Sequence, residues 1–177
     1  MKKIFFKTAI ILLVILCASF SGFSQGNNEL AYQPISLGND ITYYSVTISE
    51  RLPSNDANMK AVRDFAKQFK GVNNAEWYQV EDGFMATFTE NEIVTKVAYD
   101  PKGNWHSTLR TYSESKLPFD IRGLVKSKYY DYSILVVYEI THPGNLTYIM
   151  KIEDSKNIKT LRVSNGEIEV IGDYTRG

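Results

Sequence analysis

The sequence predicts an α+β protein in which two tandem helix-plus-four-strand meander units form an antiparallel sheet, with the helices on one face. Two observations support this prediction. The stretches Ala75–Tyr112 and Ile134–Tyr174 each divide into four short β-forming segments with turn residues at the joins. A helical apolar pattern precedes each stretch. The sequence therefore predicts the same order of elements, one helix followed by four strands, twice along the chain.

The first helical pattern has one apolar stripe, and lysine and arginine occupy its other face. The stripe consists of Met59, Val62, Phe65, Ala66 and Phe69. Spacings of three and four residues place these side chains together, so we expect this helix to pack on the sheet.

The second helix is predicted to begin at Leu117-Pro118, because proline is tolerated in a first helical turn. Its stripe continues through Ile121, Leu124, Val125 and Tyr129. Gly123 weakens this helix by about 1 kcal/mol relative to alanine, which suggests a close approach to the sheet.

Eight strands are expected, four in each unit. In the first unit they are Glu76–Glu81, Phe84–Thr89, Ile93–Asp100 and Trp105–Tyr112. In the second they are Ser133–Thr141, Leu146–Glu153, Ile158–Val163 and Glu167–Tyr174. At the first join, Asp82-Gly83 predicts a two-residue turn with positive φ values. The first core is expected to contain Trp77, Phe84, Phe88, Trp105 and Leu109, and the second Leu135, Val137, Tyr148, Met150 and Ile168.

The first 24 residues have the form of a signal peptide. Three lysines, Lys2, Lys3 and Lys7, precede the apolar run Ala9–Ala18, which is too short for a spanning helix. Small residues, Gly22 and Ser24, stand at positions −3 and −1 before Gln25, so we expect cleavage there and a periplasmic or secreted protein. The alternative is a lipoprotein anchored at Cys17, which the bulky residues before that cysteine disfavour.

Four segments follow from these patterns. The residues between the signal and the first helix form a leader, in which Ile41–Ile48 alternates like an extra edge strand. Whether that strand joins the sheet is left open. The segments are the signal peptide 1–24, the leader 25–57, the first unit 58–113 and the second unit 114–177.

Composition excludes several classes of function. Removing the signal takes three of the 20 basic residues and none of the 20 acidic ones, which leaves a net charge of about −3. A mildly acidic surface disfavours nucleic acid as a partner. Cys17, the only cysteine, leaves with the signal, so disulfides and thiolate chemistry are excluded from the mature chain.

Certain motifs resemble the PepSY-like family of exported proteins, which are described as β-lactamase-inhibitor-like. They are Ala75-Glu76-Trp77, Asp82-Gly83-Phe84, the turn Tyr99–Trp105, Leu117-Pro118 and Tyr129-Tyr130. The resemblance covers about residues 58–177 and rests on turn and core residues. It implies helices on one face of an antiparallel sheet and an open, concave second face that binds protein. The absence of mature cysteines departs from the disulfide-bearing inhibitors, and no inhibitor contact residue can be carried over.

No catalytic motif is present, so neither an enzyme, a cofactor nor a metal site is predicted. Only His106 and His142 are imidazole bases, and neither lies in a nucleophile motif or in a metal-ligand spacing. His142 precedes Pro143-Gly144 and is interpreted as a turn residue. His106 is interpreted as a solvated strand residue, with a partner contact as the alternative.

The predicted function is a non-catalytic protein-binding module that inhibits or regulates a protein of the cell envelope. A binder of a small molecule or an envelope glycan is the alternative. Because strand side chains alternate, residues between the core positions should form the binding face. They are Tyr78, Met85, His106, Arg110 and Tyr112 in the first unit and Tyr138, Ile149 and Lys151 in the second. The identity of the partner and the oligomeric state cannot be read from the sequence.

Overall fold

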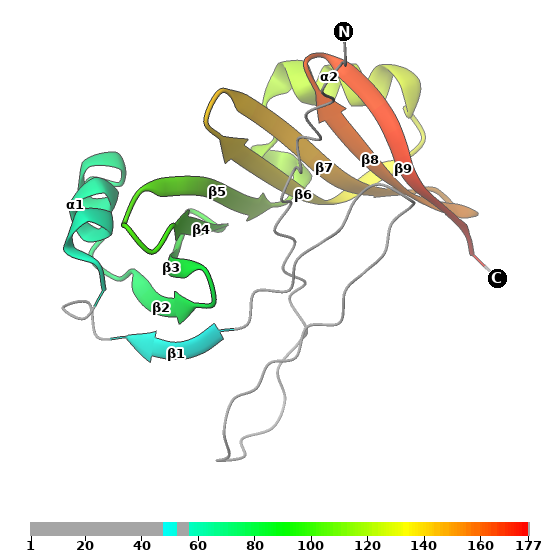
Figure 1. The fold of residues 1–177 in the computed structure, drawn as a ribbon. Coiled ribbons are helices and arrows are strands. Elements are labelled where there is room, and N and C mark those ends of the chain that lie inside the picture. The colour runs from blue at the N-terminus through cyan, green and yellow to red at the C-terminus, as the bar shows by residue number, and fades with distance from the viewer. Residues whose placement is uncertain (1–47, 53–56, 177) are drawn as a thin grey trace, which may run out of the picture.

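The computed structural model describes residues 48–52 and 57–176 (Figure 1). In chain order its helices are α1 (Met59–Gln68), the short 3-10 helix η1 (Glu114–Lys116) and α2 (Phe119–Lys128). Its strands are β1 (Ile48–Leu52), β2 (Glu76–Val80), β3 (Gly83–Glu90), β4 (Ile93–Tyr99), β5 (Trp105–Tyr112), β6 (Ser133–His142), β7 (Asn145–Glu153), β8 (Asn157–Ser164) and β9 (Glu167–Thr175). All eight strands predicted for the two units are present, to within a residue or two at their ends. The signal peptide and nearly all of the leader lie outside the described residues.

The strands form a single antiparallel sheet in the order β1 to β9, and each strand pairs with the next one along the chain. The α+β class and the antiparallel sheet are thereby confirmed. One helix precedes β2–β5 and one precedes β6–β9, but a repeat relation between the two halves stays a prediction. Of the predicted edge strand Ile41–Ile48, only Ile48 is described, as the first residue of β1. None of the described helices is long and apolar enough to cross a membrane.

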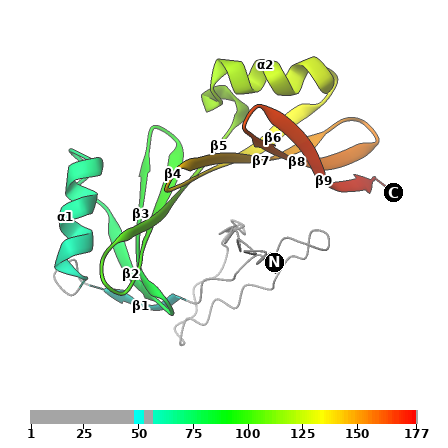
Figure 2. The same ribbon diagram turned by 45° about the horizontal axis from the view of Figure 1, so that its top comes forward.

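Both helices lie on the same face of the sheet. Val97 of β4 packs in the core under α1, and Thr95 is two residues away on the same face. From Thr95 the register runs across the sheet through Arg110 and Glu139 to Tyr148, which packs in the core under α2. Figure 2 shows the sheet bending between its two halves, with α1 and α2 on the outer side of the bend. We call this the helix face and the opposite one the inner face.

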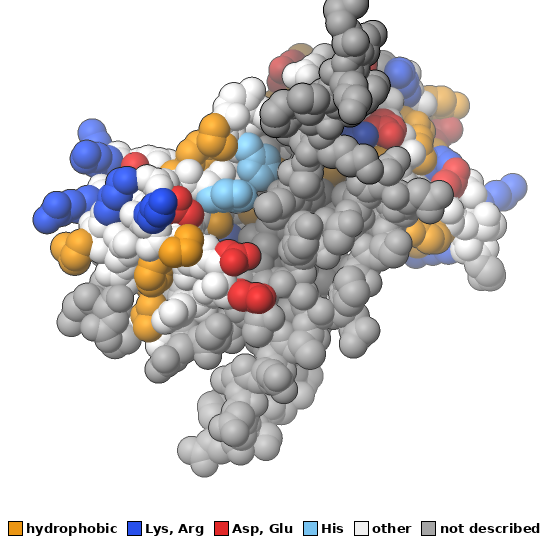
Figure 3. Space-filling view, in the orientation of Figure 1, with side chains coloured by type: hydrophobic (Ala, Val, Ile, Leu, Met, Phe, Trp, Pro, Cys, Tyr) orange, Lys and Arg blue, Asp and Glu red, His pale blue; other side chains and the backbone are white. Residues whose placement is uncertain are grey.

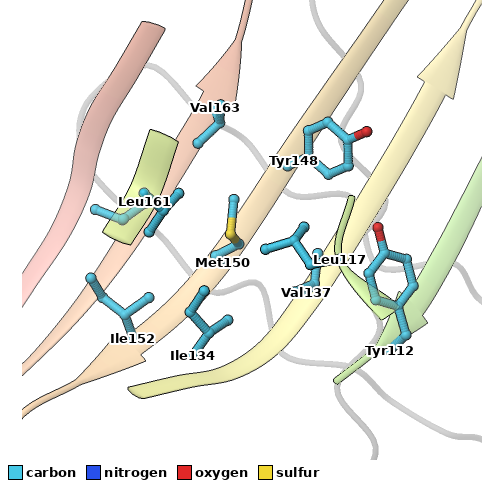
Figure 4. Packing of buried hydrophobic residues seen from close by; sticks show 10 residues of the cluster. Tyr112, Leu117, Ile134, Val137, Tyr148, Met150, Ile152, Leu161 and Val163 are labelled. Carbon is cyan, nitrogen blue, oxygen red and sulfur yellow. The ribbon is translucent and has the colours of Figure 1, made fainter. Parts of the chain in front are cut away.

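Each helix closes a separate apolar core on the helix face. Under α1, Phe65 meets Phe88 edge to face with ring centroids 5.7 Å apart. Under α2, Tyr112, Val137, Met150 and Leu161 lie in one row across four strands (Figure 4). The core predictions are confirmed for Trp77, Phe84, Phe88, Trp105, Val137, Tyr148, Met150 and Ile168, which are buried in these clusters or pack against them. They are wrong for Leu109 and Leu135.

Two β-bulges explain these errors. The ladder between β4 and β5 shifts where Ala98 pairs with Ser107 but Tyr99 pairs with Trp105, so the residues after the bulge change face. Leu109 therefore points to the inner face. In β6 the register shifts between Ile134 and Val136, which leaves Leu135 as the extra, unpaired residue. A strict two-residue alternation, as assumed from the sequence, cannot anticipate an inserted residue.

Glu114 ties the connection between β5 and β6 to the second half of the sheet. Its carboxylate accepts a hydrogen bond from Arg122 Nε of α2 at 2.8 Å and one from the Ile134 backbone N–H of β6 at 3.4 Å. Burial raises the pKa of Glu114, but the hydrogen bond from Arg122 and the charge of Lys126 outweigh this effect and lower it overall. The carboxylate is thus held charged between η1, α2 and β6.

The φ values agree with the residue types at one hairpin turn and differ from the prediction at another. Asn165-Gly166 has positive φ at both residues, as a two-residue turn with Asn-Gly requires. At Asp82-Gly83 only the glycine has a positive φ, of 141°, so the predicted pair of positive values is wrong. A Cβ atom on Gly83 would lie 2.0 Å from the carbonyl oxygen of Tyr99. Glycine is required here by this contact with the next hairpin.

We predict that Gly83→Ala destabilises the protein by roughly 1–3 kcal/mol, because alanine meets both a positive φ and a backbone atom. Gly123→Ala is the matched control. A Cβ atom there meets nothing within 4 Å, so the close approach expected at Gly123 is wrong. Alanine in this helix should stabilise by about 1 kcal/mol. Urea unfolding followed by circular dichroism measures both, and equal effects of the two substitutions would contradict the turn geometry.

Because of the bulge in β6, we predict a large loss of stability on substitution of Ile134 and a small one on substitution of its neighbour Leu135. Ile134→Ala removes a side chain that is only 6% exposed in the core under α2 and should cost about 2–5 kcal/mol. Leu135→Ala removes a side chain that is 43% exposed and should cost less than about 1 kcal/mol. The free energies of unfolding of the two variants decide the register, and a larger loss at Leu135 would mean that the bulge is misplaced.

Candidate protein-binding face

The inner face carries an apolar strip that runs from the first half of the sheet into the second. Leu109 of β5 pairs with Ile140 of β6, and Tyr138 of β6 pairs with Ile149 of β7. These four residues form their own apolar cluster, which Val136 and Ile171 extend. Met85 of β3 lies on the same face in the first half, pairs with Tyr78 and Ala98 rather than with the cluster, and is 2% exposed. The structure describes no helix packed over this face. The side of the sheet away from the helices is therefore apolar rather than uniformly solvated.

A polar network lies on the inner face at the far edge of the first half of the sheet. On the β1–β2 side, the Tyr78 hydroxyl donates to Glu76 Oε2 at 2.6 Å, and Arg51 Nη2 lies 2.5 Å from Glu76 Oε1. Burial and the neighbouring Glu76 carboxylate raise the pKa of the Tyr78 hydroxyl, so it stays protonated as the donor. Tyr78 is half-buried in this arrangement rather than freely exposed.

A second polar border lies on the β7–β9 side. Lys151 is exposed on the inner face, across from Val136 of β6. Arg162 of β8 pairs in register with Ile149 of the strip, and its guanidinium binds the Glu169 carboxylate of β9. An apolar centre with a rim of charged and hydrogen-bonded residues has the composition of a protein interface.

Arg110 and Tyr112 do not lie on the inner face, which corrects the sequence prediction. The bulge in β5 turns both side chains to the helix face. The Tyr112 hydroxyl donates to Glu139 Oε2 at 2.6 Å, and Arg110 Nη1 lies 3.1 Å from Glu139 Oε1. Burial and the Glu139 carboxylate raise the pKa of Tyr112, so its hydroxyl remains a donor at neutral pH. These three residues make a polar seam between the two cores.

The other predicted residues fall on or beside the inner face. Tyr138 and Ile149 belong to its apolar strip and Met85 lies on the same face in the first half; all three are buried. Lys151 lies beside the strip and is exposed, and Tyr78 lies at the far edge of the first half. His106 is the extra residue of the β5 bulge and is exposed. Sequence reasoning missed Leu109 and Ile140, because a regular alternation assigns Leu109 to the opposite face.

The two histidines come together although 35 residues of sequence lie between them. His142 is the last residue of β6 rather than a turn residue, and its ring meets that of His106 edge to face with centroids 5.9 Å apart. Figure 3 shows the pair, in pale blue, at the surface. Burial lowers the pKa of His142, the carbonyl of His106 partly offsets this, and the His106 ring lowers it further. The His142 ring is therefore held in its neutral form.

No group of three or more histidine, cysteine, aspartate or glutamate side chains with metal-binding geometry occurs in the described part of the chain. The predicted absences of a catalytic activity, a cofactor and a metal site all stay predictions. The inner face offers apolar side chains at its centre and polar side chains beside them.

The Tyr112–Glu139 contact predicts a structural role for Tyr112. Tyr112→Phe removes the donor to a carboxylate whose side chain is only 12% exposed, so it should cost about 1–3 kcal/mol of stability. Tyr130→Phe alters a tyrosine that is 78% exposed and should change the free energy of unfolding by less than about 0.5 kcal/mol. Chemical denaturation of the two variants tests this, and equal stabilities would show that the seam hydrogen bond contributes nothing.

Solved structures share this fold. The chain is similar to a BLIP-like protein of Bacteroides fragilis, with a TM-score of 0.55 and 17% sequence identity over 71% of this chain and 90% of that one. A DUF2874 family protein of Bacteroides ovatus has a TM-score of 0.53 and 17% identity, covering 67% of this chain and 87% of that one. A protein of Bacteroides eggerthii, described provisionally as periplasmic, has a TM-score of 0.51 and 14% identity over 67% and 88% of the two chains.

The sequence itself matches no family model and no curated protein. At identities of 14–17% the structural similarity concerns the fold alone. The β-lactamase-inhibitor-like part of the predicted resemblance is thus supported at the level of the fold, whereas the PepSY part has no counterpart among these structures. The described chain has the fold of BLIP-like and DUF2874 proteins.

Proposed function

We propose that the protein is an exported, non-catalytic module that binds another protein of the cell envelope through its inner face. The observation that supports this most directly is the apolar cluster Leu109, Tyr138, Ile140 and Ile149 on the side away from both helices. A sheet face that is only solvated favours polar residues, so an apolar cluster on this face sets it apart from an ordinary solvated one. Its four residues are at most 9% exposed, so a partner would contact mainly the accessible residues of the same face.

The composition of the border fits the same role. A binding surface needs accessible residues around a dehydrated centre, and the inner face has such residues in both halves of the sheet. Tyr78 and Val136 are half-buried and Lys151 is exposed, so all three are in reach of a partner. The buried residues of the strip lie next to Val136 and Lys151.

The predicted export of the chain supports a binding partner that is located in the cell envelope. The proposed cleavage before Gln25 lies outside the described residues and is decided by N-terminal sequencing of the exported protein. The fold similarity to BLIP-like proteins and to a protein described provisionally as periplasmic agrees with this location. Inhibition of the partner is one consequence that binding could have, and it requires the partner to be identified first.

Site-specific cross-linking tests the proposed face. A photoreactive amino acid is introduced at Val136 on the inner face, and in a matched protein at Phe119, which is 89% exposed on α2. We expect a discrete cross-linked envelope protein from position 136 that is absent from position 119. Identical sets of cross-linked proteins from both positions would contradict a specific inner face.

Substitutions on the border then measure its contribution to binding. Tyr78→Ala combined with Lys151→Glu should weaken binding of the cross-linked partner by about tenfold or more, as expected for contact residues worth above 1 kcal/mol. Thermal unfolding of this variant shows whether the fold is kept. Lys128→Glu, on the exposed end of α2, is the charge-matched control and should bind like the parent. Unchanged binding by the inner-face variant would remove this face from consideration.

A further inference from the structure

His106 and His142 form a pair whose geometry goes beyond the packing of two neighbouring side chains. His106 protrudes as the extra residue of the β5 bulge, and His142 ends β6 on the adjacent strand. Their ring centroids are 5.9 Å apart. The bulge moves the residue before Ser107 out of the regular ladder and thereby directs it toward the end of β6. The pairing thus depends on a local irregularity of the backbone.

His142 has an unused ligand atom. Its Nε2 is buried and has no hydrogen-bond partner of regular geometry within the described part of the chain, although the His106 carbonyl acts on the ring and partly offsets the lowering of its pKa by burial. Buried polar atoms without a partner are uncommon in folded proteins, and each one calls for an explanation such as an ion. An imidazole nitrogen without a hydrogen bond is the group that transition metals use as a ligand in proteins.

The separation of the rings permits both to reach one metal ion. A metal–nitrogen distance of about 2.1 Å and about 1.2 Å from a ring nitrogen to its centroid allow coordinating rings to stand up to roughly 6.6 Å apart. The observed 5.9 Å is within this limit. Because the rings now meet edge to face, one of them must rotate for both nitrogens to converge. His106 is exposed and can change its rotamer without disturbing either core.

We propose that His106 and His142 together form a binding site for a divalent transition-metal ion, which Cu²⁺ occupies more tightly than Ni²⁺ or Zn²⁺. Two imidazole ligands suit these borderline ions, and the order of affinity follows the general preference of nitrogen sites. Hard cations such as Mg²⁺ and Ca²⁺ prefer oxygen ligands and should not bind. With two protein ligands, water or a ligand from a partner completes the coordination. The proposal does not depend on the inner face binding a protein.

Calorimetric titration tests the site on the exported chain, purified without a polyhistidine tag and with the same N-terminus in every variant. We expect the parent to bind one Cu²⁺ ion, with weaker binding of Ni²⁺ and Zn²⁺ and none of Mg²⁺. His106→Ala and His142→Ala should each weaken Cu²⁺ binding by at least about tenfold, because losing one ligand abolishes the chelate. Electron paramagnetic resonance of the Cu²⁺ complex should show coupling to two imidazole nitrogens in the parent and to no more than one in either variant.

A second measurement separates metal binding from folding. Cu²⁺ should raise the unfolding temperature of the parent and leave those of the two histidine variants unchanged, because a ligand stabilises only the folded state that binds it. The unfolding temperatures of the metal-free variants establish that they fold. Lys151→Ala, a change at an exposed residue away from the pair, is the matched control and should bind Cu²⁺ like the parent. Parent-like Cu²⁺ affinity in folded His106→Ala or His142→Ala would overturn the proposal.

Discussion

The pairing of β5 with β6 is the contact on which the rest of the structure depends. This ladder joins Thr108–Tyr112 to Val137–Thr141 and so makes one sheet of two halves. The two strands are not linked by a short hairpin, since η1 and α2 lie between them in the chain. Closing this longer connection costs conformational entropy, which the contacts of Glu114 with α2 and β6 help to offset.

The β5–β6 ladder also determines where the two cores meet. Arg110 and Glu139 are opposite each other in its register, and Tyr112 adds its hydrogen bond to the same carboxylate. A charged side chain that is largely buried is tolerated only when its hydrogen-bonding capacity is met, as it is here from two sides. The seam thus separates two apolar clusters that share one face of the sheet.

The difference between the two faces has a simple physical origin. Each helix has one apolar stripe and covers only the strands beneath it, so all helix packing takes place on the helix face. The inner face is left to the side chains that alternate with these core positions. Bulges modify that alternation locally, and in β5 one bulge both turns Leu109 inward and brings His106 beside His142. A single inserted residue therefore shapes both the apolar strip and the histidine pair.

The sequence by itself determined the strands, the helices and most of the core, because these depend on local periodicity and on turn residues such as Asn165-Gly166. It also placed Tyr78, Tyr138 and Lys151 on the correct side of the sheet. Only the tertiary structure decided the faces of Arg110 and Leu109 and the contact between the histidines. The physical reason is that a bulge is a property of two paired strands: the extra residue is defined by the partner it lacks, and one strand's sequence does not carry that information.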